Sequence, residues 1–134
     1  MNSIMDNVKC WLEEFDAVSV HGKDSKRFLN GLTTSNINLE NEVIQTCWLT
    51  PKGALRAILE IYFYKDHLVL IALEGNLFEI KKFFEDMIFP TDDILLSDIF
   101  KKFRIQDINE SVPWREGCPK LIKENNIREY LKKN

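Results

Sequence analysis

Three strand-length segments that follow one another along residues 42–73 constrain the fold of this chain more than any other feature. Residues 42–50 have the composition of a strand, and the "TPKG" that follows supplies proline and glycine where a type I turn favours them. A second segment, residues 55–64, ends at "KD", and the almost wholly apolar residues 67–73 come next. Because turns this short reverse the chain, the sequence predicts neighbouring antiparallel strands.

Two amphipathic stretches predict helices on either side of these strands. Asp24 or Ser25 can cap the first helix, since either side chain can accept hydrogen bonds from the free N–H groups of the first turn. Apolar residues recur at helical spacing along residues 77–89, and Pro90 ends that helix. With strands also at residues 15–20, 94–99 and 103–108, this order predicts an α+β fold. We expect an antiparallel sheet with helices on one face, in a ferredoxin-like split β-α-β arrangement, and an open second face.

Composition argues against several classes of protein. The 134 residues suffice for one domain, and the net charge of −3, with basic residues spread among acidic ones, argues against nucleic-acid binding. No apolar run approaches the roughly 18 residues of a membrane span, and the N-terminus lacks a secretory pattern. The cysteines Cys10, Cys47 and Cys118 are widely separated. We therefore expect no metal site, no disulfide, no membrane association and a cytoplasmic location.

One stretch contains more polar and turn-forming residues than a short surface helix needs. It is "VHGKDSKRFLNGLTTSNINL", and "CWLTPKGALRAILEI" and "NLFEIKKFFEDMIF" follow it. In order and spacing, these segments resemble the N-terminal domain of the folate-binding YgfZ family, within the superfamily of the glycine-cleavage T-protein (GcvT). The matching positions are Gly22, Asp24, Ser25, Phe28, Leu29, Asn30, Gly31, Thr34, Asn36, Ile37, Pro51, Lys52 and Gly53.

The resemblance extends over roughly residues 15–108 and implies a domain organisation. Residues 1–108 would form the N-terminal domain of this fold, and residues 109–134 a connecting segment and terminal helix that lead toward a C-terminal part. The family binds tetrahydrofolate and assists the maturation or repair of iron–sulfur cluster enzymes. The implied partners are therefore a folate ligand and iron–sulfur enzymes.

Two departures from the superfamily pattern bear on activity. T-protein enzymes use an aspartate in the strand after the glycine turn for aminomethyl transfer, and Ile58 occupies that position here. Isoleucine cannot accept a proton, and Glu60 is the only local carboxylate that is a candidate to replace the aspartate. The family's K-G-C-[YF]-x-G-Q-E signature is also missing, and "EGC" at residues 116–118 is only an echo of it. The resemblance implies a folate-binding accessory protein without transferase activity. A one-carbon folate enzyme and a scaffold domain that binds no folate are the alternatives.

Each candidate for folate binding also has an ordinary structural interpretation. Residues 30–36 could line a pocket or satisfy the end of a helix. Trp48 could stack on a pterin ring or pack in the core. Lys52 could meet the glutamate tail of a folate or be a solvated turn residue, and Arg56 could face the pocket or pair across strands. No catalytic or metal-binding residue is predicted. The folate candidates are Asn30, Thr34, Asn36, Trp48, Lys52, Arg56 and Glu60.

Overall fold

The computed structural model describes residues 10–32, 43–49, 52–107, 119–123 and 126. The chain divides into two compact units, residues 16–100 and residues 1–15 with 101–134. The predicted domain boundary at residue 108 and the predicted terminal helix fall on residues outside the described ranges, and they stay predictions.

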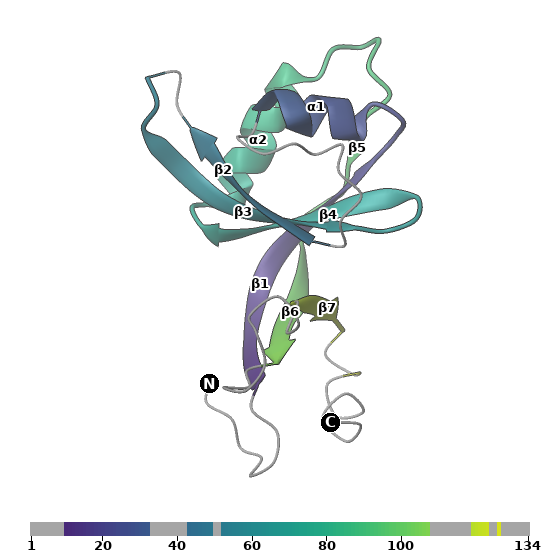
Figure 1. Ribbon diagram of the computed structural model, residues 1–134. Coiled ribbons are helices and arrows are strands. Elements are labelled where there is room, and N and C mark those ends of the chain that lie inside the picture. The colour runs from purple at the N-terminus through teal and green to yellow at the C-terminus, as the bar shows by residue number, and fades with distance from the viewer. Residues whose placement is uncertain (1–9, 33–42, 50–51, 108–118, 124–125, 127–134) are drawn as a thin grey trace. The chain divides into compact units, whose positions relative to one another are not determined.

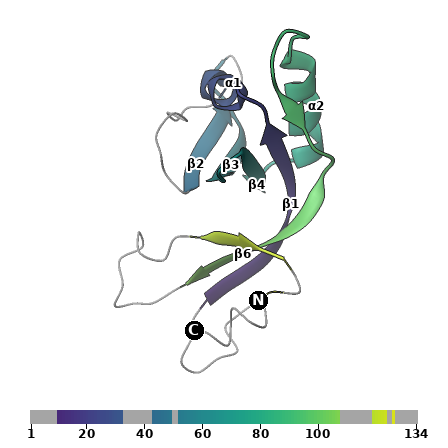
Figure 2. The same cartoon turned by 90° about the vertical axis from the view of Figure 1, so that its right-hand side faces the viewer.

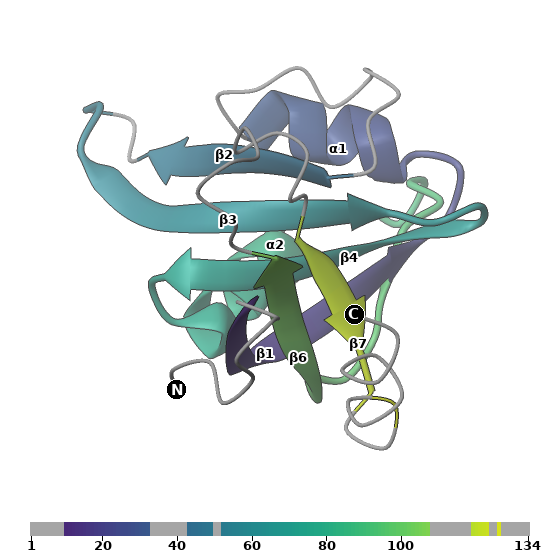
Figure 3. The same ribbon diagram turned by 60° about the horizontal axis from the view of Figure 1, so that its bottom comes forward.

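The larger unit is built on an antiparallel sheet. Its strands lie in the order β2-β3-β4-β1, and Figure 3 shows β2, β3 and β4 side by side. Each neighbouring pair is antiparallel, which the short turns predicted for β2–β3 and β3–β4. The two-residue β5 also pairs with β1. The strands are β1 (Cys10–His21), β2 (Val43–Leu49), β3 (Leu55–Phe63), β4 (His67–Glu74) and β5 (Leu95–Leu96).

Two helices cover one face of this sheet. In Figures 1 and 2, α1 (Ser25–Leu32) lies over β2 and β3, and Figure 1 shows α2 (Leu77–Met87) on the same side. Leu29 of α1 and Phe84 of α2 are fully buried in a single cluster with strand residues such as Leu59 and Leu70. The predicted α+β fold, an antiparallel sheet with helices on one face, is thereby confirmed.

The second face of the sheet is buried as well. Successive side chains of a strand point to opposite faces, so residues that alternate with the core positions face away from the helices. Glu60 and Tyr62 of β3 are 1% and 3% exposed, and Val69 and Ile71 of β4 are 3% and 0% exposed. The prediction that this face lies open is therefore wrong for these residues.

The strand near residues 94–99 is shorter than predicted. Only Leu95 and Leu96 pair with β1. At the next residue, Ser97, one of the two hydrogen bonds to β1 involves a side chain. The N–H of Ser97 donates to the carbonyl oxygen of Ser19 (2.9 Å), and the N–H of Ser19 donates to Ser97 Oγ (2.9 Å). A serine hydroxyl thus takes the place of a backbone acceptor and ends the strand.

The smaller unit contains strands that the sequence predicted only in part. β6 (Phe100–Asp107) begins earlier than predicted, and it pairs with β7 (Lys120–Ile122), which was expected to be part of a connection. Leu12 and Ile105 are buried together, with Phe103 and Ile122 packed against them. A three-residue strand has no periodicity of its own, so only its partner strand defines it.

Candidate functional site

The "GKDS" sequence at residues 22–25 joins β1 to α1 and is bound to the loop after α2. The N–H of Asp24 donates to the carbonyl oxygen of Asp93 (3.2 Å), and the N–H of Asp93 donates to Asp24 Oδ2 (2.9 Å). The N–H of Lys23 donates to Asp93 Oδ2 (3.2 Å). Gly22 adopts a φ of +110°, and a Cβ atom there would lie 2.0 Å from the carbonyl oxygen of Asp93. This part of the matched motif therefore has a clear structural role.

The side chains of Asp24 and Ser25 make hydrogen bonds that differ from the predicted helix cap. The Asp24 carboxylate accepts the Asp93 N–H and lies 3.5 Å from Nη2 of Arg27, while Ser25 Oγ donates to the carbonyl oxygen of Gly22 (2.7 Å). The backbone hydrogen bond from Asp93 lowers the pKa of Asp24, and the Arg27 guanidinium lowers it further. Asp24 therefore binds the start of α1 to the loop after α2.

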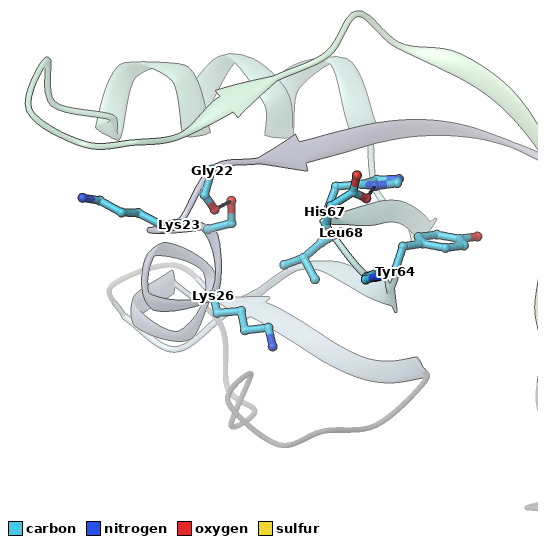
Figure 4. A pocket seen from close by; sticks show the side chains of 9 residues that line it. Gly22, Lys23, Lys26, Tyr64, His67 and Leu68 are labelled. Carbon is cyan, nitrogen blue, oxygen red and sulfur yellow. Dashed lines mark hydrogen bonds and ion pairs between the residues drawn. The ribbon is translucent and has the colours of Figure 1, made fainter.

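A cavity of about 480 Å³ lies beside this turn, between the start of α1 and the β3–β4 hairpin. Figure 4 shows Gly22 and Lys26 on one side, and Leu68, His67 and Tyr64 on the other. Polar residues dominate the lining, and lysines are the most frequent among them. The lining residues are Gly22, Lys23, Ser25, Lys26, Tyr64, Lys65, Asp66, His67 and Leu68.

Three stacked rings stand at the hairpin side of the cavity. The His67 ring lies 4.9 Å from the His21 ring and 5.0 Å from the Tyr64 ring, with interplanar angles of 14° and 13°. Nδ1 of His67 is 2.7 Å from Oδ1 of Asp66, and this hydrogen bond lowers the pKa of Asp66. Burial raises the pKa of the Tyr64 hydroxyl. The stack joins the end of β1 to the hairpin and gives the cavity an ordered wall.

Trp48 and Arg56, two of the folate candidates, lie in contact. Trp48 is 5% exposed and belongs to the core cluster, where its ring lies 4.7 Å from that of Phe83. The guanidinium carbon of Arg56 is 4.7 Å from the centre of the Trp48 ring and 5.9 Å from that of Phe83. A cation over aromatic faces at these distances is attracted to them. Arg56 thus lies against residues of the helix-covered face.

The other described candidates lie on α1 (Asn30), just before β3 (Lys52) and within β3 (Glu60). Glu60 points to the opposite face of β3, where the Tyr62 hydroxyl donates a hydrogen bond to its carboxylate. Asn30 is exposed on α1, and Lys52 is exposed just before β3. Thr34 and Asn36 lie outside the described residues. The folate-binding role of these seven residues stays a prediction.

The sequence interpretation missed the cavity residues Lys26, Tyr64 and His67. His21 and His67 are separated along the chain, and only the pairing of β1 with β4 places them opposite each other. The signal that could have found the cavity was the "YKDH" turn together with the lysines of "GKDSK". Both segments look like ordinary solvated turns when each is considered alone.

Neither a metal cluster nor a membrane helix is found in the part of the chain that the structure describes. Within it, no three His, Cys, Asp or Glu side chains lie close enough together to hold a metal ion. Cys47 is partly buried in β2, and the side chains of Cys10 and Cys118 are outside the described set. No helix in these ranges is both long and apolar enough to cross a membrane.

The chain is similar to aminomethyltransferases both in sequence and in structure. No family model matches the chain. An aminomethyltransferase of Nitrosomonas europaea is 36% identical over 52 residues, which cover 37% of this chain and 14% of that protein. The crystal structure of glycine cleavage system aminomethyltransferase T from Bartonella henselae matches with a TM-score of 0.60 and 14% identity, over 72% of this chain and 28% of that one. The chain thus spans only a small part of the proteins it matches. We conclude that it has the α+β fold of part of a T-protein-like aminomethyltransferase.

Proposed function

We propose that this chain is part of a tetrahydrofolate-binding accessory protein of the aminomethyltransferase type, which binds the folate without transferring an aminomethyl group. The proposal extends to an assisting role in the maturation or repair of iron–sulfur enzymes in the cytoplasm. It is supported by the YgfZ-like order of motifs along residues 15–108 and by the fold shared with aminomethyltransferase T.

The proposal that no aminomethyl group is transferred rests on the burial and hydrogen bonding of Glu60, the one carboxylate in β3. Strand β3 follows the glycine turn, and Glu60 is its single acidic residue, while Ile58 stands where the resemblance places the catalytic aspartate. Glu60 is 1% exposed and accepts a hydrogen bond from the Tyr62 hydroxyl. A general acid or base must reach its substrate within hydrogen-bond distance. A carboxylate that is buried and bonded to its own strand is poorly placed to do so.

A calorimetric titration with 5-formyltetrahydrofolate, a stable reduced folate, tests the binding part. We expect saturable binding of one folate per chain, either to this chain or to a longer protein that contains it. Absence of binding in both would favour a scaffold domain instead. Binding by the longer protein alone would mean that this chain supplies only part of the folate site.

A one-carbon assay tests the absence of transferase activity. We expect no tetrahydrofolate-dependent release of the aminomethyl group from a lipoyl carrier protein. Turnover that disappears in a folded Glu60→Gln variant would instead establish the enzymatic alternative, with Glu60 as its acid–base group.

The iron–sulfur part of the proposal needs its own measurement. In cells that lack the protein, we expect at least one iron–sulfur enzyme to lose activity while its polypeptide level is unchanged. Full activity of all assayed iron–sulfur enzymes in those cells would contradict the assisting role. It would not bear on the proposal that the protein binds folate.

A further inference from the structure

We propose that the cavity between the start of α1 and the β3–β4 hairpin binds a small polyanion, a molecule with two or more phosphate or carboxylate groups. Three lysines line this cavity, Lys23 and Lys26 from the start of α1 and Lys65 from the hairpin turn. Asp66 is the one acidic residue in the described lining. This excess of positive charge occurs in a chain whose net charge is −3.

The three lysines differ from neighbouring basic residues in their partners. Arg27 Nη2 lies 3.4 Å from Asp92 Oδ1 and 3.5 Å from Asp24 Oδ1, and Lys81 Nζ lies 3.9 Å from Glu85 Oε2. Among the described residues, no ion pair joins a cavity lysine to a carboxylate. Lys23 lies close enough to Asp24 to lower the pKa of that carboxylate, so Lys26 and Lys65 carry most of the charge offered to a ligand.

In the described part of the chain, Asp66 is hydrogen-bonded to His67 and forms no ion pair with a cavity lysine. Oδ1 of Asp66 lies 2.7 Å from Nδ1 of His67, whose ring is held between those of His21 and Tyr64. The Lys26 ammonium lies 5.6 Å from the centre of the Phe63 ring, and Figure 4 shows its side chain extending away from α1. The lysines therefore border a cavity in whose described lining the one acidic residue, Asp66, is hydrogen-bonded to His67.

Size and lining both favour a small charged ligand. A cavity of about 480 Å³ lies within the range of roughly 300–1,000 Å³ that small-molecule sites occupy. Leu68 is the only aliphatic residue in the described lining, and most of the others carry a polar or charged group. Lysine ammonium groups on flexible stems bind phosphate and carboxylate as point charges. None of the described folate candidates lines the cavity.

Calorimetric titration of the whole chain at low ionic strength tests the proposal, with pyrophosphate and citrate as the probes. We expect saturable binding of at least one of them, weakened by added salt because exposed charges are screened. A double variant, Lys26→Gln with Lys65→Gln, should bind that probe at least about tenfold more weakly. A control with the same change in net charge, Lys82→Gln with Lys120→Gln on α2 and β7, should change affinity by less than about twofold.

The outcomes separate this proposal from folate binding. Binding of pyrophosphate alone would identify phosphate as the recognised group, and binding of citrate alone would identify carboxylate. No saturable binding of either probe, or equal weakening in both double variants, would overturn the proposal. The unchanged protein and both double variants are also titrated with 5-formyltetrahydrofolate. If none of them binds this folate, the result with pyrophosphate and citrate still stands. Thermal melting confirms that both double variants are folded.

Discussion

Gly22 lies so close to Asp93 that a Cβ atom on the glycine would stand 2.0 Å from the aspartate carbonyl oxygen. Its φ of +110° is also one that side chains other than hydrogen rarely allow. Asp93 also forms hydrogen bonds with Lys23 and Asp24, which join the start of α1 to the loop after α2. This close approach explains the glycine of the "GKDS" sequence without any ligand.

The substitution Gly22→Ala should therefore destabilise the protein by about 2 kcal/mol or more, because backbone atoms would have to move apart. Gly31→Ala is the matched control, since nothing lies within 4 Å of a Cβ atom at that helical position. It should stabilise the protein by about 0.5–1 kcal/mol. Urea denaturation measures both changes. Equal effects of the two substitutions would contradict the close approach at Gly22.

The Asp24 carboxylate should make stability depend on pH. Its pKa is lowered from the ordinary value of 3.8, chiefly by the hydrogen bond from the Asp93 N–H, so the folded state favours the ionised form. This contribution is present above the unfolded pKa and is lost as the pH falls through the folded pKa. Asp24→Asn should therefore lower the denaturation midpoint at pH 7, and its difference from the unchanged protein should shrink below about pH 4. Thermal melts from pH 3 to pH 7 measure this, with Asp86→Asn on the exposed surface of α2 as the control.

The hydrogen bond between Tyr62 and Glu60 should contribute to stability because both residues are buried. Tyr62→Phe keeps the ring and removes the hydroxyl donor, so it should cost about 1–3 kcal/mol of the free energy of unfolding. Tyr64→Phe is the control, since Tyr64 is 43% exposed, and it should cost less than about 0.5 kcal/mol. A double-mutant cycle with Glu60→Gln measures the coupling between the pair. Additive effects in that cycle would be evidence against the bond.

Asn76 is the N-cap residue of α2. Its Oδ1 accepts hydrogen bonds from the N–H groups of Phe78 (2.9 Å) and Glu79 (3.3 Å). Asn76→Ala should lower the free energy of unfolding by about 1 kcal/mol, whereas Asn76→Asp should retain the cap. Chemical denaturation of the three proteins tests this. A destabilisation by Asp as large as that by Ala would rule out a capping role.

Phe84 is the largest fully buried side chain of the core between the helices and the sheet. Its ring contacts those of Phe28 and Trp48 with centroid distances of 5.7 Å in both cases. Phe84→Ala should cost about 3–5 kcal/mol because it leaves a cavity among these rings. Phe78→Ala on the same helix should change stability by less than about 0.5 kcal/mol, since Phe78 is 61% exposed. Comparable losses in the two variants would contradict this placement of the helix.

Much of the larger unit could be predicted because its signals are local. The alternation and short turns along residues 42–73 predicted β2, β3 and β4 to within a residue or two, and apolar spacing predicted α2. The weaker predictions concern β5 and β7, where pairing with a distant strand decides whether a short segment is a strand. Hydrophobic periodicity carries no information at that length.

The candidate site was harder to predict because its residues come from separate segments. Trp48 could be a stacking wall or a core residue from its sequence neighbours alone, and burial in the helix-covered cluster was needed to place it. Arg56 lies over the Trp48 and Phe83 rings, a contact that its sequence neighbours did not indicate. A long side chain has many rotamers of similar energy, and its tertiary neighbours select among them.

The amino-acid sequence alone determined the α+β class, the antiparallel hairpins and the two helices, because turn residues and apolar periodicity act between near neighbours in the chain. Only the tertiary structure decided that Glu60 is buried, that Gly22 touches Asp93, and that His21 and His67 stack beside a lysine-lined cavity. These arrangements depend on strand register and on how distant loops meet, and each joins residues whose own neighbours in the sequence do not specify the contact.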